Sequence, residues 1–380
     1  MACSAQATRQ QQDRKAAVTP KQREPWEGVR AASRDGAARL PGFNSAPVCY
    51  TLPMNRAPAA PPRVAIVGPT ASGKTAVGIA LARILETEIV SADSMQVYQH
   101  MDIGTAKPTL AERAQAVFHA VDVVPPDAAW TLADFQALGS RACDALAAQG
   151  RMPLVVGGTG LYVRALTTIL DIPQTPPDPA FRERWRTLAQ ERGTAFVQSE
   201  LAQVDPQAAA RIHVNDLGRL VRALEVYQAT GMPLSEWHAR NKAKNDQANV
   251  ILFGLNYADR RELYQRIEQR VDLMLAAGLA DEVRGLLAQG YGADLKPMQS
   301  LGYRQIAAML AGEATEAGAV DEIKRKTRHF ARRQLIWFRA DPRIRWLEAG
   351  EKSPRDLAQE IASSLSEEAA TTHKGRKLDE

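Results

Sequence analysis

A glycine-rich segment near residue 70 has the residue types and spacing of a phosphate-binding loop. It lies between an apolar run at Arg63–Val67 and a helical pattern at 75–85. It matches G-x-x-x-x-G-K-[ST] with Gly68, Pro69, Thr70, Ala71, Ser72, Gly73, Lys74 and Thr75. In such a loop, backbone N–H groups and the helix N-terminus face an anion, the lysine supplies a charge, and the Thr hydroxyl binds Mg²⁺. We therefore predict a di- or triphosphate site with Mg²⁺ as its cofactor. A glycine-rich turn alone would not explain Lys74 and Thr75.

The apolar run that could complete a nucleoside triphosphatase ends without an acid. Residues 154–156 are followed by Gly157, Gly158, Thr159 and Gly160, where a Walker-B carboxylate would be expected. The phosphate loop therefore does not by itself indicate ATP hydrolysis, although ATP stays among the candidate ligands of the loop.

Asp93 follows another apolar run, at 88–92. Because the carboxyl ends of parallel strands meet at one edge of a sheet, Asp93 is expected close to the phosphate loop. A carboxylate there could act as a general base or hold Mg²⁺ through water. Position alone does not separate these roles from an Asp that caps the next turn.

The elements that position these residues indicate an α/β fold. Apolar runs alternate with helical patterns, which predicts a P-loop parallel sheet flanked by helices, with an all-helical insertion domain. The expected strands are 63–67, 88–92, 152–156, 249–255 and 343–347. The expected core helices are 75–85, 132–149, 161–170, 260–277, 279–289, 302–311 and 320–339.

Composition divides the chain into five segments. Residues 1–62 are expected to be a disordered basic tail, or an extension ahead of a natural start at Met54. Residues 63–178 form the first part of the P-loop core. Residues 179–245 form the helical insertion, with helices at 181–192, 195–203, 206–212 and 216–230. Residues 246–350 complete the core with a basic helix. Residues 351–380 form a terminal helix and, beyond about residue 364, a disordered tail.

Charge and cysteine content exclude several classes of protein. The 380 residues carry a formal charge of +5, but residues 1–62 hold nine Lys/Arg against four Asp/Glu, which leaves residues 63–380 neutral. The basic composition therefore does not itself indicate a nucleic-acid binder. No apolar stretch is long enough for a membrane span. Three cysteines without metal or disulfide spacing exclude a zinc finger and a secreted disulfide scaffold.

The helix expected at 320–339 is locally basic. It contains Lys324, Arg325, Lys326, Arg328, Arg332, Arg333 and Arg339. Such a run is commonly a solvated face, and Phe330 and Trp337 are expected more readily in the core than stacked on bases. The helix alone leaves RNA contact open.

Eight blocks in chain order resemble the bacterial-type tRNA dimethylallyltransferases, also called tRNA isopentenyltransferases. The blocks begin at Gly68, Ser91, Met101, Val156, Arg211, Arg219, Gly302 and Arg332. The resemblance implies transfer of a dimethylallyl group from dimethylallyl diphosphate to N6 of the adenine 3′ of a tRNA anticodon. It implies that residues 68–75 bind the prenyl diphosphate, that Lys74 and Thr75 act there with Mg²⁺, and that Asp93 is the general base. It also implies that Arg270 assists the diphosphate, whereas the residues alone allow a solvated face that Arg270 shares with Arg266.

The resemblance further implies that the partner is a tRNA anticodon stem-loop and that the helical insertion at 179–245 faces the tRNA. The matching positions are Asp93, Ser94, Met95, Gln96, Thr159, Arg182, Gly218, Arg219, Leu220, Val221, Arg222, Gln299, Ser300, Leu301, Gly302, Tyr303, Arg304, Arg332, Arg333, Gln334, Trp337 and Arg339. A cytoplasmic monomer without membrane attachment is expected. Three other functions stay open: a P-loop small-molecule kinase, an adenylate isopentenyltransferase that acts on free nucleotide, and a non-enzymatic RNA-binding protein.

Overall fold

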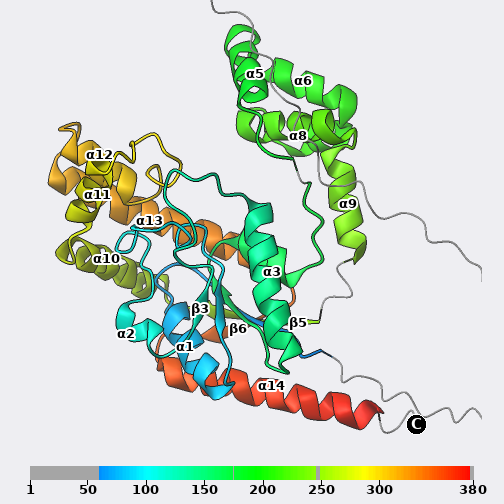
Figure 1. The fold of residues 1–380 in the computed structure, drawn as a ribbon, viewed down its shortest axis with the longest axis vertical. Helices are drawn as coiled ribbons and strands as arrows, with labels where there is room; N and C mark the ends of the chain where they lie inside the picture. Colours follow the sequence, from blue (N-terminus) through cyan, green and yellow to red (C-terminus); the bar gives the residue numbers. More distant parts are fainter. Residues whose placement is uncertain (1–59, 174, 245–248, 377–380) are drawn as a thin grey trace, which may run out of the picture. The chain divides into compact units, whose positions relative to one another are not determined.

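A six-stranded parallel sheet lies at the centre of the described chain (Figure 1). The computed structural model describes residues 60–173, 175–244 and 249–376. The strands are β1 (Arg63–Val67), β2 (Ile89–Ser91), β3 (Phe118–His119), β4 (Leu154–Gly157), β5 (Val250–Asn256) and β6 (Ile344–Glu348). Their order is β3-β2-β4-β1-β5-β6, so β1 pairs with β4 on one side and with β5 on the other. The predicted parallel α/β fold is confirmed.

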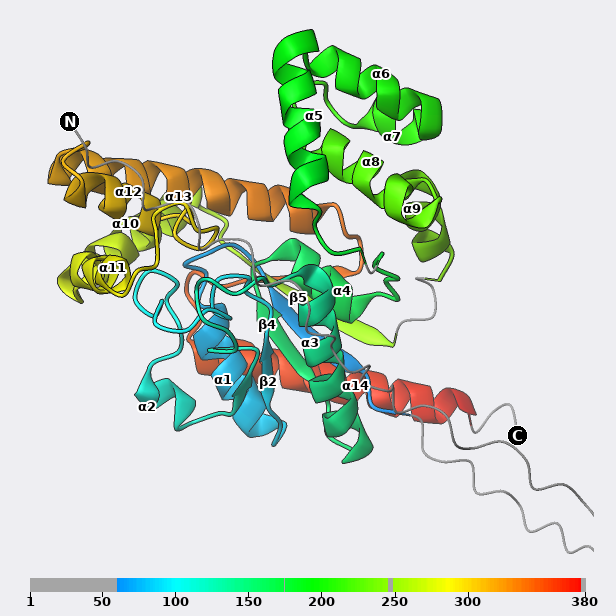
Figure 2. The same cartoon turned by 45° about the horizontal axis from the view of Figure 1, so that its top comes forward.

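Helices cover both faces of this sheet. The core helices are α1 (Lys74–Ile84), α2 (Leu110–Arg113), α3 (Leu132–Ala148), α4 (Gly160–Thr167), α10 (Arg260–Ala276), α11 (Leu279–Ala288), α12 (Tyr303–Leu310), α13 (Glu316–Arg339) and α14 (Pro354–Arg376). Successive strand residues point to opposite faces. Ala65 and Val67 therefore pack with α3 and α4, whereas Val64 and Ile66 pack with α1 and α14. Figure 2 shows α13 as a long helix with α10, α11 and α12 at one of its ends.

The helical insertion has an apolar core of its own. Its helices are α5 (Pro179–Arg192), α6 (Thr194–Val204), α7 (Pro206–Arg211), α8 (Leu217–Thr230) and α9 (Leu234–Lys244). Val197, Leu201 and Leu220 are fully buried among them. Asp side chains cap α5, α7 and α8 by accepting a backbone N–H in the first turn. Helix α9 is not one of the four helices that the sequence predicts for the insertion, because its many polar residues hide the apolar period.

The last helix is longer than predicted. Helix α14 continues to Arg376, so the expectation of a disordered tail from about residue 364 is wrong. Its apolar residues Leu357, Ile361 and Leu365 recur every fourth position and are buried, with α1 packed against them. The Ala and Glu residues that follow favour continuation of a helix. Residues 1–59 and 377–380, which include most of the predicted tails, lie outside the described residues.

Two short elements, α2 and β3, fall outside the predicted elements because neither is long enough to show a period. Across the part of the chain that the structure describes, no helix combines the length and the apolar character that crossing a membrane requires.

Candidate active site

Three loops meet at the carboxyl edge of the sheet. The phosphate loop follows β1, Asp93 follows β2, and Gly158 follows β4, and these strands are neighbours in the order β2-β4-β1. The Thr159 N–H donates to the Ala92 carbonyl at 3.1 Å, which joins the second and third loops. The predicted phosphate site and the predicted acid are therefore brought together, as strands that end at one edge require.

The phosphate loop leaves the N-terminus of α1 open to an anion. Helix α1 begins at Lys74 without a side-chain cap, and its first turn contains no acid. Ala71 and Gly73 have positive φ angles of 63° and 85°, a geometry typical of loops that surround an anion with backbone N–H groups. A Cβ atom at Gly68 would lie 2.8 Å from the Leu255 carbonyl oxygen, so this position requires glycine.

The surroundings of the phosphate loop strongly affect the charge of Lys74. Its ammonium donates to the Pro69 carbonyl at 2.5 Å. Burial and the positive charge of Arg270 lower the pKa of Lys74 to about 7, while the negative charge of Asp93 acts in the opposite direction. A diphosphate in the loop would add the negative charge that favours the ammonium form.

Two arginines of α10 approach the phosphate loop. Arg270 lines one cavity with Lys74 and Asp93. Burial lowers the pKa of Arg270, and the charge of Asp93 partly offsets this shift. The interpretation of Arg270 as part of a solvated face is therefore wrong. The exposed Arg266 also contacts the loop, because its Nε donates to the Ala71 carbonyl at 3.1 Å.

Asp93 caps a turn and also lines the cavity beside the phosphate loop. Its Oδ1 accepts the Met95 N–H at 2.9 Å, so it caps the following turn. Its charge also acts on Lys74 and Arg270 across the cavity that all three line. Capping therefore does not remove Asp93 from the phosphate site.

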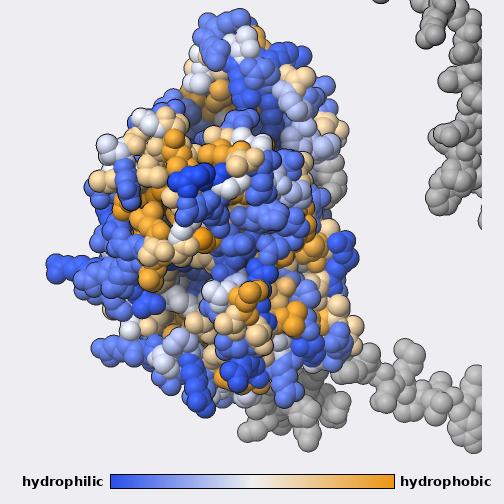
Figure 3. All heavy atoms as spheres, turned by 60° about the vertical axis from the view of Figure 1, so that its left-hand side comes forward, coloured by the Kyte–Doolittle hydropathy of each residue, from blue (hydrophilic) through white to orange (hydrophobic). Residues whose placement is uncertain are grey.

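Two cavities meet at Lys74, Thr75 and Arg270. The smaller has a volume of about 70 Å³ and extends to Asp93, with walls that include Ile89, Ser91, Gln96, Phe118, Val156, Gly157, Gly158, Phe330 and Gln334. The larger has a volume of about 870 Å³ and lies between α10 and residues 102–113. Its wall includes Leu110 and Leu273, which are 87% and 70% exposed. Figure 3 brings forward the side of the molecule that carries α10 and α2, where apolar side chains lie among polar ones.

The donor set fits Mg²⁺ that arrives with a phosphate ligand. Thr75 and Asp93 supply a hydroxyl and a carboxylate to the smaller cavity. Among the described residues, no group of three or more His, Cys, Asp or Glu side chains could hold a metal by itself. Mg²⁺ commonly takes one or two protein oxygens and completes its shell with phosphates and water.

The absence of an acid at the end of β4 has a steric cause. A Cβ atom at Gly157 would lie 2.2 Å from the Ala92 carbonyl oxygen, so no side chain fits there. The carboxylate of this site is instead supplied by Asp93, at the end of the neighbouring strand.

The residues that follow Asp93 differ in accessibility. Ser94 and Thr159 are half-buried and joined, because the Ser94 N–H donates to Thr159 Oγ1 at 3.0 Å. Met95 packs partly against the core. Gln96 is buried: its Oε1 accepts from Ser91 Oγ at 2.9 Å, and its Nε2 donates to the Ala106 carbonyl at 3.1 Å. Gln96 therefore shapes the cavity wall.

Two predicted tRNA-contacting arginines of the insertion bind a buried acid. Glu225 is 4% exposed. It accepts hydrogen bonds from Arg182 at 2.8 and 2.9 Å and from Arg222 at 2.5 Å. Burial would raise the pKa of Glu225, but these hydrogen bonds hold it below its usual range. Both arginines therefore have a structural task besides any contact with tRNA.

Burial divides the other predicted tRNA positions into two groups. Leu220, Val221 and Tyr303 are packed in the protein interior, so their side chains offer no surface to tRNA. Gly302 is also buried, and Ser300 and Leu301 are half-buried. The exposed positions are Gly218, Arg219, Gln299, Arg304, Arg332, Arg333, Trp337 and Arg339.

Gln334 of α13 connects two loops of the site. Its Oε1 accepts the Thr70 N–H at 2.7 Å, and its Nε2 donates to the Gly158 carbonyl at 2.9 Å. The side chain is 7% exposed. Gln334 thus holds the phosphate loop and does not present a free amide to tRNA.

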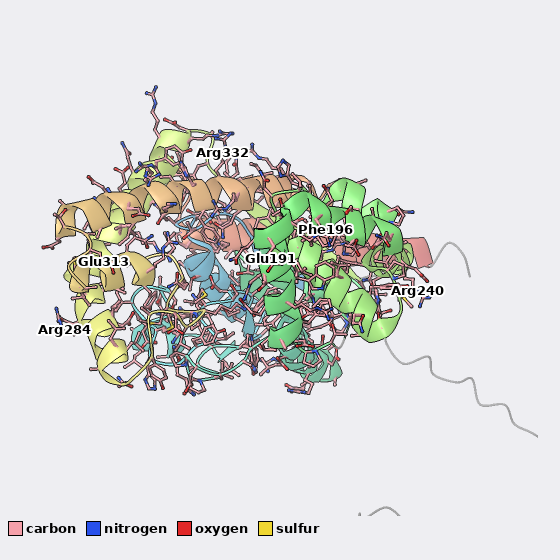
Figure 4. The ribbon with its side chains drawn as sticks, turned by 90° about the horizontal axis from the view of Figure 1, so that it is seen from above. Glu191, Phe196, Arg240, Arg284, Glu313 and Arg332 are labelled. Carbon is pink, nitrogen blue, oxygen red and sulfur yellow. The ribbon has the colours of Figure 1, made fainter. Side chains whose placement is uncertain are left out.

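The aromatic residues of α13 lie at the edge of its buried face. Phe330 and Trp337 are 37% and 45% exposed, so the interpretation of both as core residues is wrong. Leu335 and Phe338 occupy the buried face instead. Figure 4 shows the exposed Arg332 on the outer side of α13. This helix therefore presents aromatic and basic groups together.

Sequence reasoning missed Lys107 and Glu282, which both hold the loop at 102–106. Lys107 is buried and donates to Asp102 at 2.6 Å and to Asp122 at 2.5 Å. The polar block that begins at Met101 is the signal that could have found Lys107. Glu282 lies within a helix whose sequence carries no such signal.

Two family models match the chain. The IPP transferase model matches residues 96–341, and a model described as isopentenyl transferase matches residues 63–117. The tRNA dimethylallyltransferase 1 of Pelobacter propionicus is 47% identical over 306 residues, which cover 80% of this chain and 98% of that protein. The tRNA dimethylallyltransferase of Desulforudis audaxviator is 46% identical and covers 81% and 99%.

Solved structures agree with these relatives. The tRNA isopentenylpyrophosphate transferase of Bacillus halodurans has a TM-score of 0.60 at 36% identity, over 82% of this chain and 99% of that chain. A eukaryotic dimethylallyltransferase, described as acting on tRNA, has a TM-score of 0.68 at 26% identity, over 82% and 79%. With the phosphate loop, Asp93 and Arg270 at one sheet edge, these likenesses show that the chain belongs to the IPP transferase family, as a tRNA dimethylallyltransferase.

Proposed function

We propose that the chain transfers a dimethylallyl group from dimethylallyl diphosphate to N6 of the adenine 3′ of a tRNA anticodon and releases diphosphate. The observation that carries this proposal is the position of Lys74, Thr75 and Arg270 between two cavities, one of which contains Asp93. A donor bound there has cations at its phosphates and a carboxylate beyond them.

In this proposal the diphosphate binds at the N-terminus of α1, against Lys74, Thr75 and Arg270. The prenyl group lies in the smaller cavity, beside the apolar side chains of Val156 and Phe330. When the carbon–oxygen bond breaks, its electron pair leaves with the diphosphate, and the lysine, the arginine and the backbone N–H groups stabilise the growing negative charge. Thr75, together with the donor's own oxygens, would hold Mg²⁺, which would supply further stabilisation of that charge when bound.

The acceptor must reach the cavity from the Asp93 side. An adenine within a stacked loop has to leave the stack before its N6 can meet the donor. N6 forms a bond to the prenyl carbon, and Asp93 accepts the proton that N6 loses. We propose that Ser94, Thr159 and the exposed arginines of α13 contact the tRNA. We further propose that the enzyme acts as a monomer in the cytoplasm.

The substrate assay separates this function from its alternatives. Radiolabelled dimethylallyl diphosphate is offered with tRNA, AMP, ADP or ATP, and label is expected on tRNA alone. Label on free nucleotide but not on tRNA would favour an adenylate isopentenyltransferase. Phosphate transfer from ATP to a small molecule without RNA would favour a kinase.

A further inference from the structure

Glu282 of α11 holds a loop of the donor site through four hydrogen bonds. Its Oε2 accepts the N–H groups of Asp102 at 2.8 Å and Ile103 at 2.7 Å. Its Oε1 accepts the Gly104 N–H at 3.1 Å and the Tyr303 hydroxyl at 2.6 Å. Consecutive backbone N–H groups that converge on one negative charge form an anion-binding nest. Here the chain's own carboxylate fills that nest.

Tyr303 fixes the same loop from the other side. Its side chain is fully buried, and a Cβ atom at Gly104 would lie 2.4 Å from its ring. The loop backbone can therefore meet the ring only because residue 104 is glycine. Burial and the adjacent charge of Glu282 raise the pKa of Tyr303, so its hydroxyl stays a hydrogen-bond donor at neutral pH.

The loop carries this restraint to the cavities. The carbonyl groups of Thr105 and Ala106 accept from Gln96 Nε2 at 3.4 and 3.1 Å. Ala106 lines both cavities. Its φ angle is 47°, a left-handed conformation that a residue other than glycine adopts only where its surroundings enforce it. Lys107 then anchors the far end of the loop through the Tyr98 carbonyl at 2.5 Å.

We propose that Glu282 is a positioning residue for the prenyl diphosphate site. Its hydrogen bonds fix the start of the segment 102–106, whose residues contribute to both cavities: Thr105 and Ala106 line the smaller one, and Asp102, Ile103 and Ala106 line the larger one. Losing the carboxylate frees this segment and weakens donor binding, while the exposed surface proposed for tRNA is unchanged. This inference rests on the proposed function, because it takes dimethylallyl diphosphate as the ligand of the site.

The test compares Glu282→Gln with a matched neighbour. Glutamine keeps the size of the side chain but places an NH₂ group where one carboxylate oxygen accepted. Asp281→Asn removes a charge from the same first turn of α11, and Asp281 pairs with Arg284 of its own helix and not with the loop. Glu282→Gln should raise the KM for dimethylallyl diphosphate by about ten- to a hundredfold, because small misplacements at a site are costly. The KM for tRNA should stay unchanged in both variants.

Direct binding of pyrophosphate, measured by calorimetry without tRNA, should weaken in Glu282→Gln and not in Asp281→Asn. This measurement does not depend on prenyl transfer. If the unmodified chain transfers no prenyl group, the proposed function fails, and the loss of pyrophosphate affinity still decides the role of Glu282.

Three results would overturn the inference: unchanged donor and pyrophosphate binding in folded Glu282→Gln, an equal loss in Asp281→Asn, or a loss confined to tRNA. If Glu282→Gln does not fold, Tyr303→Phe decides, because it removes one of the four hydrogen bonds. It should raise the same donor KM by a smaller factor, and an unchanged KM would contradict the proposal.

Discussion

At the scale of single residues, identity and environment contribute separately to the proposed chemistry. Asp93 and Lys74 have the residue types that proton transfer and phosphate binding require. Their neighbours then modify these properties. One oxygen of Asp93 accepts the Met95 N–H and caps the following turn, and burial lowers the pKa of Lys74. Each effect gives a measurable consequence.

Asp93→Asn should separate catalysis from folding. Asparagine retains the oxygen that accepts the Met95 N–H, so the turn and tRNA binding should persist. The group that accepts the N6 proton is lost, which should slow transfer by about 10²–10⁴-fold. Single-turnover transfer of labelled donor measures this effect, and Asp127→Asn, at an exposed position outside the site, is the control. Full activity in Asp93→Asn would remove Asp93 as the base.

Lys74 predicts a pH dependence for diphosphate binding. In the free site its pKa is about 7, so at pH 8–9 most molecules carry a neutral amine. A bound diphosphate favours the ammonium, so binding takes up a proton, and affinity should fall as pH rises above 7 by up to about tenfold per pH unit. Below pH 7 the lysine is already charged, and this dependence should disappear.

Calorimetry of pyrophosphate binding in two buffers with different ionisation enthalpies measures the proton uptake. Lys74→Met should abolish it. The same uptake in that variant would assign the proton to another group.

At the scale of elements, helix α13 divides its tasks between two faces. Gln334 turns inward and holds the phosphate loop, whereas Arg332, two residues earlier, is exposed. The sequence pattern of basic and aromatic residues in α13 does not predict this division. Spacing along a helix shows which residues share a face, but not which part of the protein or which ligand that face contacts.

Two substitutions in α13 should therefore affect different ligands. Gln334→Leu removes two hydrogen bonds, each worth about 1 kcal/mol, and should weaken donor binding with little effect on tRNA. Arg332→Gln should leave the donor KM unchanged and reduce the salt slope of tRNA binding by about one. Filter binding over a salt series, together with donor KM values, tests both. A fall in donor affinity for Arg332→Gln would contradict this division.

At the scale of the whole molecule, net charge is a poor guide to tRNA binding. Residues 1–53 carry eight Lys/Arg and four Asp/Glu, so a chain that starts at Met54 has a formal charge of +1 instead of +5. All site residues lie in the compact unit Pro58–Glu380. We expect the shorter chain to bind tRNA within about threefold of the full chain and with the same salt slope, because local phosphate contacts set that slope. A lower slope would assign phosphate contacts to the removed residues.

The sequence by itself determined the phosphate loop, the neighbouring position of Asp93 and the parallel sheet. These features depend on local patterns and on the rule that parallel strands end at one edge. Only the tertiary structure decided that Arg270 enters the cavity, that Gln334 bonds Thr70 from 264 residues away, and that Glu282 fixes a loop about 180 residues before it. It also decided which family-matched positions are buried. The physical reason is that the packing of a helix decides whether a given face of it points toward the site or away from it. Periodicity in the sequence predicts that such a face exists, but not which element it packs against.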